Sequence, residues 1–183
     1  EIPKRDWSSD VCSSDLATNI STGSGPDRLE PAGVLSVTLD GRDTSFLEWV
    51  GAVAPSLVQA AGAMHEVTSA TFVASVHVGF SADALCLRLA GPLAALLTSQ
   101  TATLSLIIAN GEVRLLAIEA SWIAVDVLVE VAVPLTAIGI APGGELSFAV
   151  QVQDSGGVIL ESVPRGRSWT VRIPGAATSN WQA

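Results

Sequence analysis

Basic residues are scarce in this sequence, which has nine Lys and Arg residues against 18 Asp and Glu residues and a net charge of −9. Lys4 is the only lysine, and after residue 16 Arg165 and Arg167 form the only close basic pair. A groove for nucleic acid needs clustered Lys or Arg side chains to neutralise phosphates. The scarcity of basic residues therefore argues against nucleic acid as a partner.

Long apolar runs and catalytic motifs are also missing. The most apolar stretches are LAGPLAALL at 89–97 and WIAVDVLVEVAVPL at 122–135. Pro, Asp or Glu interrupts each of them before it reaches the roughly 20 residues that a membrane-spanning helix needs. The motifs GxSxG and HExxH and a phosphate-binding loop do not occur. We therefore predict no membrane span, no catalytic residue, no metal site and no cofactor.

The first 16 residues, EIPKRDWSSDVCSSDL, differ in composition from the rest. Written back into codons, residues 6–16 resemble the index-side adapter of short-read DNA sequencing. We expect residues 1–16 to be non-native and disordered, with the native sequence starting mid-protein near Ala17. The alternative is a metal site, but one Cys without a nearby His binds zinc poorly. Without residues 1–16 the net charge is −7, and Cys86 is left without a disulfide partner.

The remaining sequence divides by composition into three parts. Residues 17–33 are rich in Ser, Thr, Gly and Pro and predict a linker, residues 34–174 a folded module, and residues 175–183 a tail. Alternation of apolar and polar residues within the module is typical of strands with one buried face. The predicted strands are 34–39, 45–50, 67–79, 84–90, 102–109, 112–119, 121–133, 145–153, 157–162 and 168–173.

Turn sequences separate these strands. Asn110-Gly111 is the strongest hairpin signal, and residues 154–157, DSGG, predict a second hairpin. Short helices are predicted at 93–99 and after Pro134, where Gly139 can end the helix. Many short strands joined by antiparallel turns favour an all-β, antiparallel sandwich with one or two short helices.

The main polar cluster is LDGRDTSFLEWVGA, residues 39–52. One interpretation is a sugar site, in which Trp49 stacks on a pyranose ring while Asp40, Arg42 and Glu48 bind hydroxyl groups. The other interpretation, which we favour, is an internal network in which Trp49 is buried and Arg42 pairs with Glu48 or Asp43.

Six other side chains are candidates for chemistry. His65 is a candidate ligand or proton carrier, although a hydrogen-bonded loop histidine explains it better. In a further alternative, Met64 and His77 are candidate haem ligands. Asp126 and Glu130 share one strand face, where a solvated sheet face explains them better than an acid–base pair. Cys86 has no histidine nearby in sequence to activate it.

The residues at 39–66, LDGRDTSFLEWVGAVAPSLVQAAGAMHE, resemble the region that follows the catalytic barrel in amylase-like glycoside hydrolases of family 57. That family's pattern is a DGR–T–YFEWLGAG stretch, then GAMH, a strand ending YGFD, and LYLRLD. The counterparts here are 40–42, Thr44, 46–52, 62–65, 78–80 and 85–89. The resemblance covers most of residues 34–174. The absence of tyrosine removes two aromatic positions that could contact sugar.

The resemblance implies a β-sandwich of the immunoglobulin-like type or like family 9 carbohydrate-binding modules. Catalysis in family 57 belongs to the upstream barrel, so the implied function is a non-catalytic ancillary module. Its expected partners are the barrel of the same parent chain and an α-glucan. The expected carbohydrate-binding residues are Asp40, Arg42, Glu48, Trp49 and His65.

Two alternatives to the ancillary-module interpretation remain open. The first is a purely structural docking domain without a ligand. It is favoured by an outward-facing set on the 121–133 strand that is unusually apolar, namely Trp122, Ala124, Leu128 and Ala132. The second is a small haem-binding redox sandwich.

Overall fold

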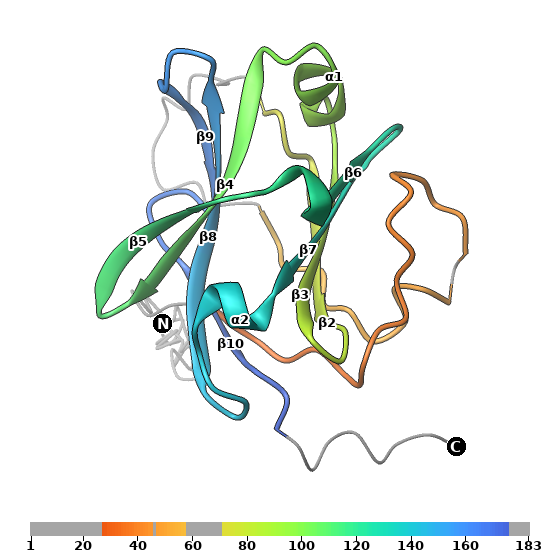
Figure 1. Cartoon of the computed structure of the whole chain (residues 1–183), viewed down its shortest axis with the longest axis vertical. Helices are drawn as coiled ribbons and strands as arrows, with labels where there is room; N and C mark the ends of the chain where they lie inside the picture. The colour runs from red at the N-terminus through yellow and green to blue at the C-terminus, as the bar shows by residue number, and fades with distance from the viewer. Residues whose placement is uncertain (1–26, 46, 58–70, 176–183) are drawn as a thin grey trace, which may run out of the picture.

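The computed structural model describes residues 27–45, 47–57 and 71–175 (Figure 1). The predicted adapter-like segment, most of the predicted linker, Met64, His65 and nearly all of the predicted tail lie outside the described residues. The described chain is an all-β sandwich of two sheets with short helices, as predicted. Every strand pair except one is antiparallel.

The smaller sheet has four strands in the order β2-β3-β7-β6. Their bounds are β2 Ser75–Phe80, β3 Ala84–Ala90, β6 Ile123–Val125 and β7 Val129–Pro134. The larger sheet has six strands in the order β1-β10-β8-β4-β5, and β9 also pairs with β8. Their bounds are β1 Asp27–Leu29, β4 Ala102–Asn110, β5 Glu112–Ala117, β8 Glu145–Asp154, β9 Ile159–Val163 and β10 Trp169–Arg172.

Short helices lie between strands at the ends of the sandwich. They are α1 Leu93–Thr98, α2 Leu135–Ile138 and the 3-10 turn η1 Ala120–Trp122. Both predicted α-helices are confirmed. Gly139 ends α2 in the left-handed conformation, with φ of 75°, as the sequence predicted.

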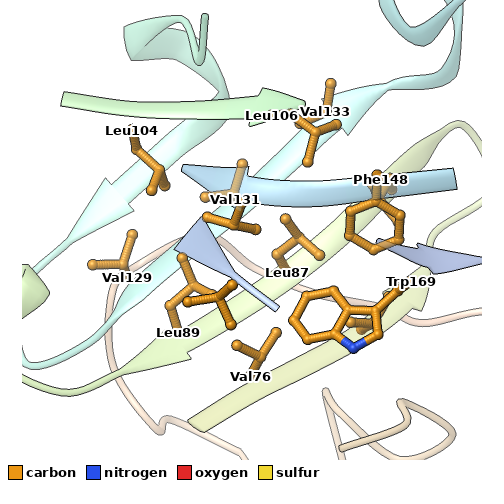
Figure 2. Packing of buried hydrophobic residues seen from close by; sticks show 14 of the residues in the cluster. Val76, Leu87, Leu89, Leu104, Leu106, Val129, Val131, Val133, Phe148 and Trp169 are labelled. Carbon is orange, nitrogen blue, oxygen red and sulfur yellow. The ribbon is translucent and has the colours of Figure 1, made fainter. Parts of the chain in front are cut away.

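The core lies between the two sheets and is built from alternate residues of each strand (Figure 2). Leu85, Leu87 and Leu89 of β3 point into it, and so do the valines at 129, 131 and 133 of β7. From the larger sheet, Phe148 and Trp169 meet edge to face, with ring centroids 5.6 Å apart. Period-two alternation therefore identified the buried face correctly.

Both predicted hairpins are confirmed. Gly111 joins β4 to β5 with φ of 88°, and the 154–157 turn joins β8 to β9. At the first hairpin the Asn110 side chain donates to the Glu145 carbonyl at 2.5 Å and accepts from the Ser147 N–H at 2.8 Å. The asparagine thus extends the β4–β8 ladder beyond its last backbone pair, between Ile108 and Phe148.

Three strand predictions are wrong. The predicted single strand 121–133 is a turn followed by the β6–β7 hairpin, because the chain reverses at 126–128 and pairs Ile123 with Val131. Apart from residue 46, which is not described, neither 34–39 nor 45–50 forms a strand; these residues lie over the outer face of the smaller sheet instead. Residues 17–33, predicted to be a linker, contain strand β1, which pairs in parallel with β10.

Candidate functional site

Residues 31–57, apart from 46, form a covering segment on the outer face of the smaller sheet, drawn in orange in Figure 1. The Leu35 N–H donates to the Phe80 carbonyl at 2.7 Å, and Val53 and Val78 exchange two backbone hydrogen bonds of 2.8 Å. Leu35 and Trp49 of the segment pack on Cys86 of β3. The segment therefore forms a third layer over this sheet.

Glu130 of β7 is the centre of the contact between the covering segment and the sheet. Its side chain is completely buried. One carboxylate oxygen accepts from the N–H groups of Asp40 and Gly41, each at 3.0 Å, and the other accepts from the Trp49 indole N–H at 3.1 Å. Glu130 was expected on a solvated face, and this expectation is wrong because the covering segment excludes water from it.

Two positively chargeable residues lie in the same row of the smaller sheet as Glu130. Arg88 pairs in register with Glu130, and His77 with Arg88. The mostly buried Arg88 guanidinium contacts the Asp43 carboxylate at 2.8 Å. The pKa of His77 is lowered, mainly because the side chain is partly buried and secondly because the positive charge of Arg88 is close. The row therefore adds an ion pair that ties the covering segment to β3.

The remaining charged residues of the DGRDT stretch bind one another or Asp126. Arg42 pairs with Asp126 in the β6–β7 turn, and not with Glu48 or Asp43 as predicted. This ion pair raises the pKa of Arg42. The Asp40 carboxylate accepts from the Arg42 N–H at 2.8 Å and from the Thr44 hydroxyl. A sequence-local partner for Arg42 was the natural expectation, because the β6–β7 reversal that brings Asp126 close was not predicted.

Two glycines of the covering segment sit where no side chain fits. Gly41 has φ of 74°, and a Cβ there would lie 2.5 Å from the Asp126 backbone nitrogen. Gly51 has φ of 98°, and a Cβ there would overlap the Ala32 carbonyl oxygen. Positive φ and close backbone approach both select glycine. The glycines of DGR and WVGA are therefore structural.

The structure brings together four of the five predicted sugar-binding residues, but it does not arrange them as an open site. Trp49 is only 7% exposed and its indole N–H is bonded to Glu130, so its ring presents no face to solvent. Arg42 is exposed, and Glu48 is half-buried with one carboxylate oxygen that has no hydrogen-bond partner. His65 lies outside the described residues. The buried Trp49 matches the internal network that the sequence favoured.

The apolar outward set on 121–133 is not an exposed patch. Ala132 packs under the Leu35–Trp49–Cys86 cluster, and Leu128 is buried and donates its N–H to the Gly41 carbonyl at 3.0 Å. Trp122 packs against the main core. These side chains are apolar because the chain covers them itself. Burial also raises the pKa of the Cys86 thiol.

Glu161 of β9 is a second buried carboxylate, which no pattern in the sequence indicates. One of its oxygens accepts from the Phe72 N–H at 2.7 Å and the Val73 N–H at 3.0 Å. Like Glu130, it binds two consecutive backbone N–H groups of a segment far away in sequence. Both glutamates therefore act as structural clamps.

The pH dependence of stability tests the Asp40 contacts. Hydrogen bonds from Thr44 and the Arg42 N–H lower the pKa of Asp40 below its usual 3.8. Ionised Asp40 then stabilises the fold above pH 3.8, and this contribution is lost as pH falls through the lower folded-state pKa. Asp40→Asn should therefore lower the melting temperature at pH 7, with the difference shrinking towards pH 2. Melting curves across this range would contradict this if the difference were constant.

No group of His, Cys, Asp and Glu side chains suited to a metal ion occurs within the described ranges. A cavity of about 870 Å³ lies between β1 and the end of β10 and is lined in part by Arg28, Leu29, Glu30, Arg172 and Ile173. Arg28 pairs there with Glu30 and Glu145. None of the four described sugar-binding candidates, Asp40, Arg42, Glu48 and Trp49, lines this cavity.

Comparisons with protein-family models, with curated proteins and with solved structures gave no match. In the part of the chain that the structure describes, no helix is both long and apolar enough to cross a membrane.

Proposed function

We propose that the chain is a non-catalytic ancillary module of an amylase-like α-glucan hydrolase, and that it packs on the catalytic barrel of that enzyme through its covering segment. The observation that carries the proposal is the division of the LEWV stretch, residues 47–50, into an inner and an outer set. Trp49 points inward to Glu130, while Leu47 is 75% and Val50 54% exposed. A stretch that is fixed on one side and apolar on the other is suited to contact with a second protein surface.

The charged residues of the segment support this proposal. Asp43 pairs with Arg88, and Arg42 pairs with Asp126. Glu130 accepts three hydrogen bonds from the segment. These contacts fix the backbone that presents Leu47 and Val50, which lowers the entropic cost of binding. Val127, in the β6–β7 turn beside Gly41, adds a further exposed apolar side chain. The same residues that carry the resemblance to family 57 would then form the contact with its barrel.

A binding experiment tests the proposed docking. The protein is titrated into the catalytic barrel of a family 57 enzyme whose own C-terminal region has been removed, and heat of binding is measured. We expect saturable binding that Leu47→Asp with Val50→Asp weakens at least tenfold. Val158→Asp is the matched control, since Val158 is 62% exposed on the β8–β9 turn. Equal weakening by the control, or no binding by the unmodified protein, would rule out this docking mode.

Contact with α-glucan belongs to the same proposal and has a separate readout. Among the described residues of the predicted sugar-binding set, the exposed Arg42 is best placed to bind a sugar hydroxyl. Affinity electrophoresis in amylose would show retardation that Arg42→Ala reduces. Unretarded migration would remove glycan contact and leave the docking role, and the isolated module should release no reducing sugar from amylose.

A further inference from the structure

The last strand of the larger sheet, β5, is an open edge. It pairs with β4 on one side, and no described strand lies on its other side. Five of its six residues are exposed, and it contains no proline or lysine. Natural edge strands are usually shortened, charged, bulged or covered to prevent pairing with another chain. In Figure 1, β5 lies at the opposite margin of the molecule from the covering segment.

The other described edges are shorter or already hydrogen-bonded. The outer strands β1 and β6 have three residues each, and β9, which pairs only with β8, has five. Beside β2, the backbone of Val53 exchanges two hydrogen bonds with Val78. β5 is therefore the described edge with the longest run of free backbone groups.

The backbone hydrogen bonds indicate which residues of β5 face outward. The Ile118 N–H donates to the Leu104 carbonyl at 3.3 Å, so Ile118 directs its backbone groups towards β4. In an antiparallel ladder this orientation alternates along the strand. The backbone N–H and C=O groups of Arg114 and Leu116 then also point towards β4. Those of Val113 and Leu115 point away from the sheet.

The same two residues carry exposed apolar side chains. Val113 is 70% and Leu115 52% exposed. Their register partners on β4 are Ala109 and Ile107, which are also apolar and half-buried. An added strand would thus gain backbone hydrogen bonds and an apolar neighbour on one face of the sheet.

The charges of β5 indicate that the added strand is a second copy of β5. Glu112 and Arg114 flank Val113, and neither forms an ion pair within the described residues. The Arg114 guanidinium is held by the Ala137 and Ile138 carbonyls at the end of α2. If two β5 strands pair about a twofold axis at Val113, Glu112 of each copy lies opposite Arg114 of the other. An axis at Arg114 would place two arginines opposite each other, which is unfavourable.

We propose that β5 pairs with β5 of a second copy of this chain, antiparallel and centred on Val113, so that two six-stranded sheets become continuous. The interface is isologous, as is usual for dimers. It is short, so the dimer should be weak and concentration-dependent. It uses a different face from the covering segment and does not depend on the proposed function.

Sedimentation velocity over a hundredfold concentration range tests the pairing. We expect a monomer–dimer equilibrium that Val113→Lys shifts at least tenfold towards monomer. Glu112→Lys, which places a second positive charge opposite Arg114, should do the same without altering an apolar residue. Val158→Lys, at a similarly exposed valine, should leave the equilibrium unchanged. A monomer at every concentration, or an equal shift with Val158→Lys, overturns the proposal.

Disulfide trapping tests the register. In a Cys12→Ser background, Val113→Cys should form a disulfide-linked dimer under mild oxidation, because paired residues of an antiparallel ladder lie about 5.5 Å apart between Cα atoms. Leu115→Cys, opposite Gly111 in this register, should remain monomeric under the same conditions. Stronger trapping at residue 115 than at 113 overturns the Val113-centred arrangement.

Discussion

Glu130→Ala is expected to lower the free energy of unfolding by about 3–6 kcal/mol. The substitution leaves three donors without an acceptor: the buried Gly41 N–H and Trp49 indole N–H and the partly buried Asp40 N–H. Each buried donor left without a partner costs about 1–3 kcal/mol. Urea denaturation followed by circular dichroism measures the change.

Two further variants distinguish the loss of the Glu130 hydrogen bonds from the loss of a negative charge. Asp126→Asn removes the other carboxylate of the β6–β7 hairpin, but its ion pair with Arg42 is exposed, so the loss should stay below about 1 kcal/mol. Glu130→Gln keeps one acceptor and the shape of the side chain and should fall between the two. A Glu130→Ala protein within 1 kcal/mol of wild type would show that the covering segment does not depend on this carboxylate.

Reactivity of Cys86 gives an independent readout of the covering segment. In a Cys12→Ser background, the buried thiol with its raised pKa should react slowly with a thiol reagent at pH 8. Glu130→Ala should accelerate labelling before global unfolding, because Leu35 and Trp49 lie over Cys86. An unchanged labelling rate would show that Glu130→Ala does not loosen the covering segment over Cys86.

Trp169→Ala is expected to cost about 3–5 kcal/mol, the usual range for truncating a buried tryptophan. The Trp169 side chain is completely buried in the core and meets Phe148 edge to face. It also lies on β10, which joins β1 to β8. Truncation should therefore leave a cavity and loosen the pairing of β1. Chemical denaturation gives the free energy, and hydrogen exchange at residues 27–29 gives the local effect.

Trp169→Phe distinguishes packing from polarity. The Trp169 indole N–H is buried without a hydrogen-bond partner. Phenylalanine removes this unsatisfied donor while keeping an aromatic ring against Phe148, so its cost should be about 1–2 kcal/mol. A Trp169→Phe protein as unstable as Trp169→Ala would contradict this account and would indicate that the indole shape itself is required.

The sandwich and most of its strands could be predicted because they depend on local pattern. Alternation in β3 and β8 separates buried from outer positions, and glycines at 111 and 157 locate two hairpins. The reversal at 126–128 could not be predicted, because Val125, Val127 and Val129 continue the alternation through the turn. There the backbone of Gly41 packs against Asp126, and its carbonyl accepts from the Leu128 N–H.

The candidate site was less predictable for the same physical reason. Residue types at 40–49 identified the segment, but the partner that orders it, Glu130, lies about 90 residues further along the chain. A glutamate on a strand usually lies on a solvent-exposed face. Only a structure shows that a distant segment covers this position, and that Trp49 and Asp40 turn towards it.

The parallel pairing of β1 with β10 has a consequence for how the protein forms on the ribosome. Asp27 and Arg167, which form an ion pair beside this pairing, are separated by 140 residues. Strand β1 therefore cannot pair until β10 has been synthesised, and only then is the larger sheet complete. Contacts of such long sequence separation slow folding. A nascent chain arrested before Trp169 should accordingly carry an unpaired β1, and completion of the larger sheet should follow the emergence of β10 from the ribosome.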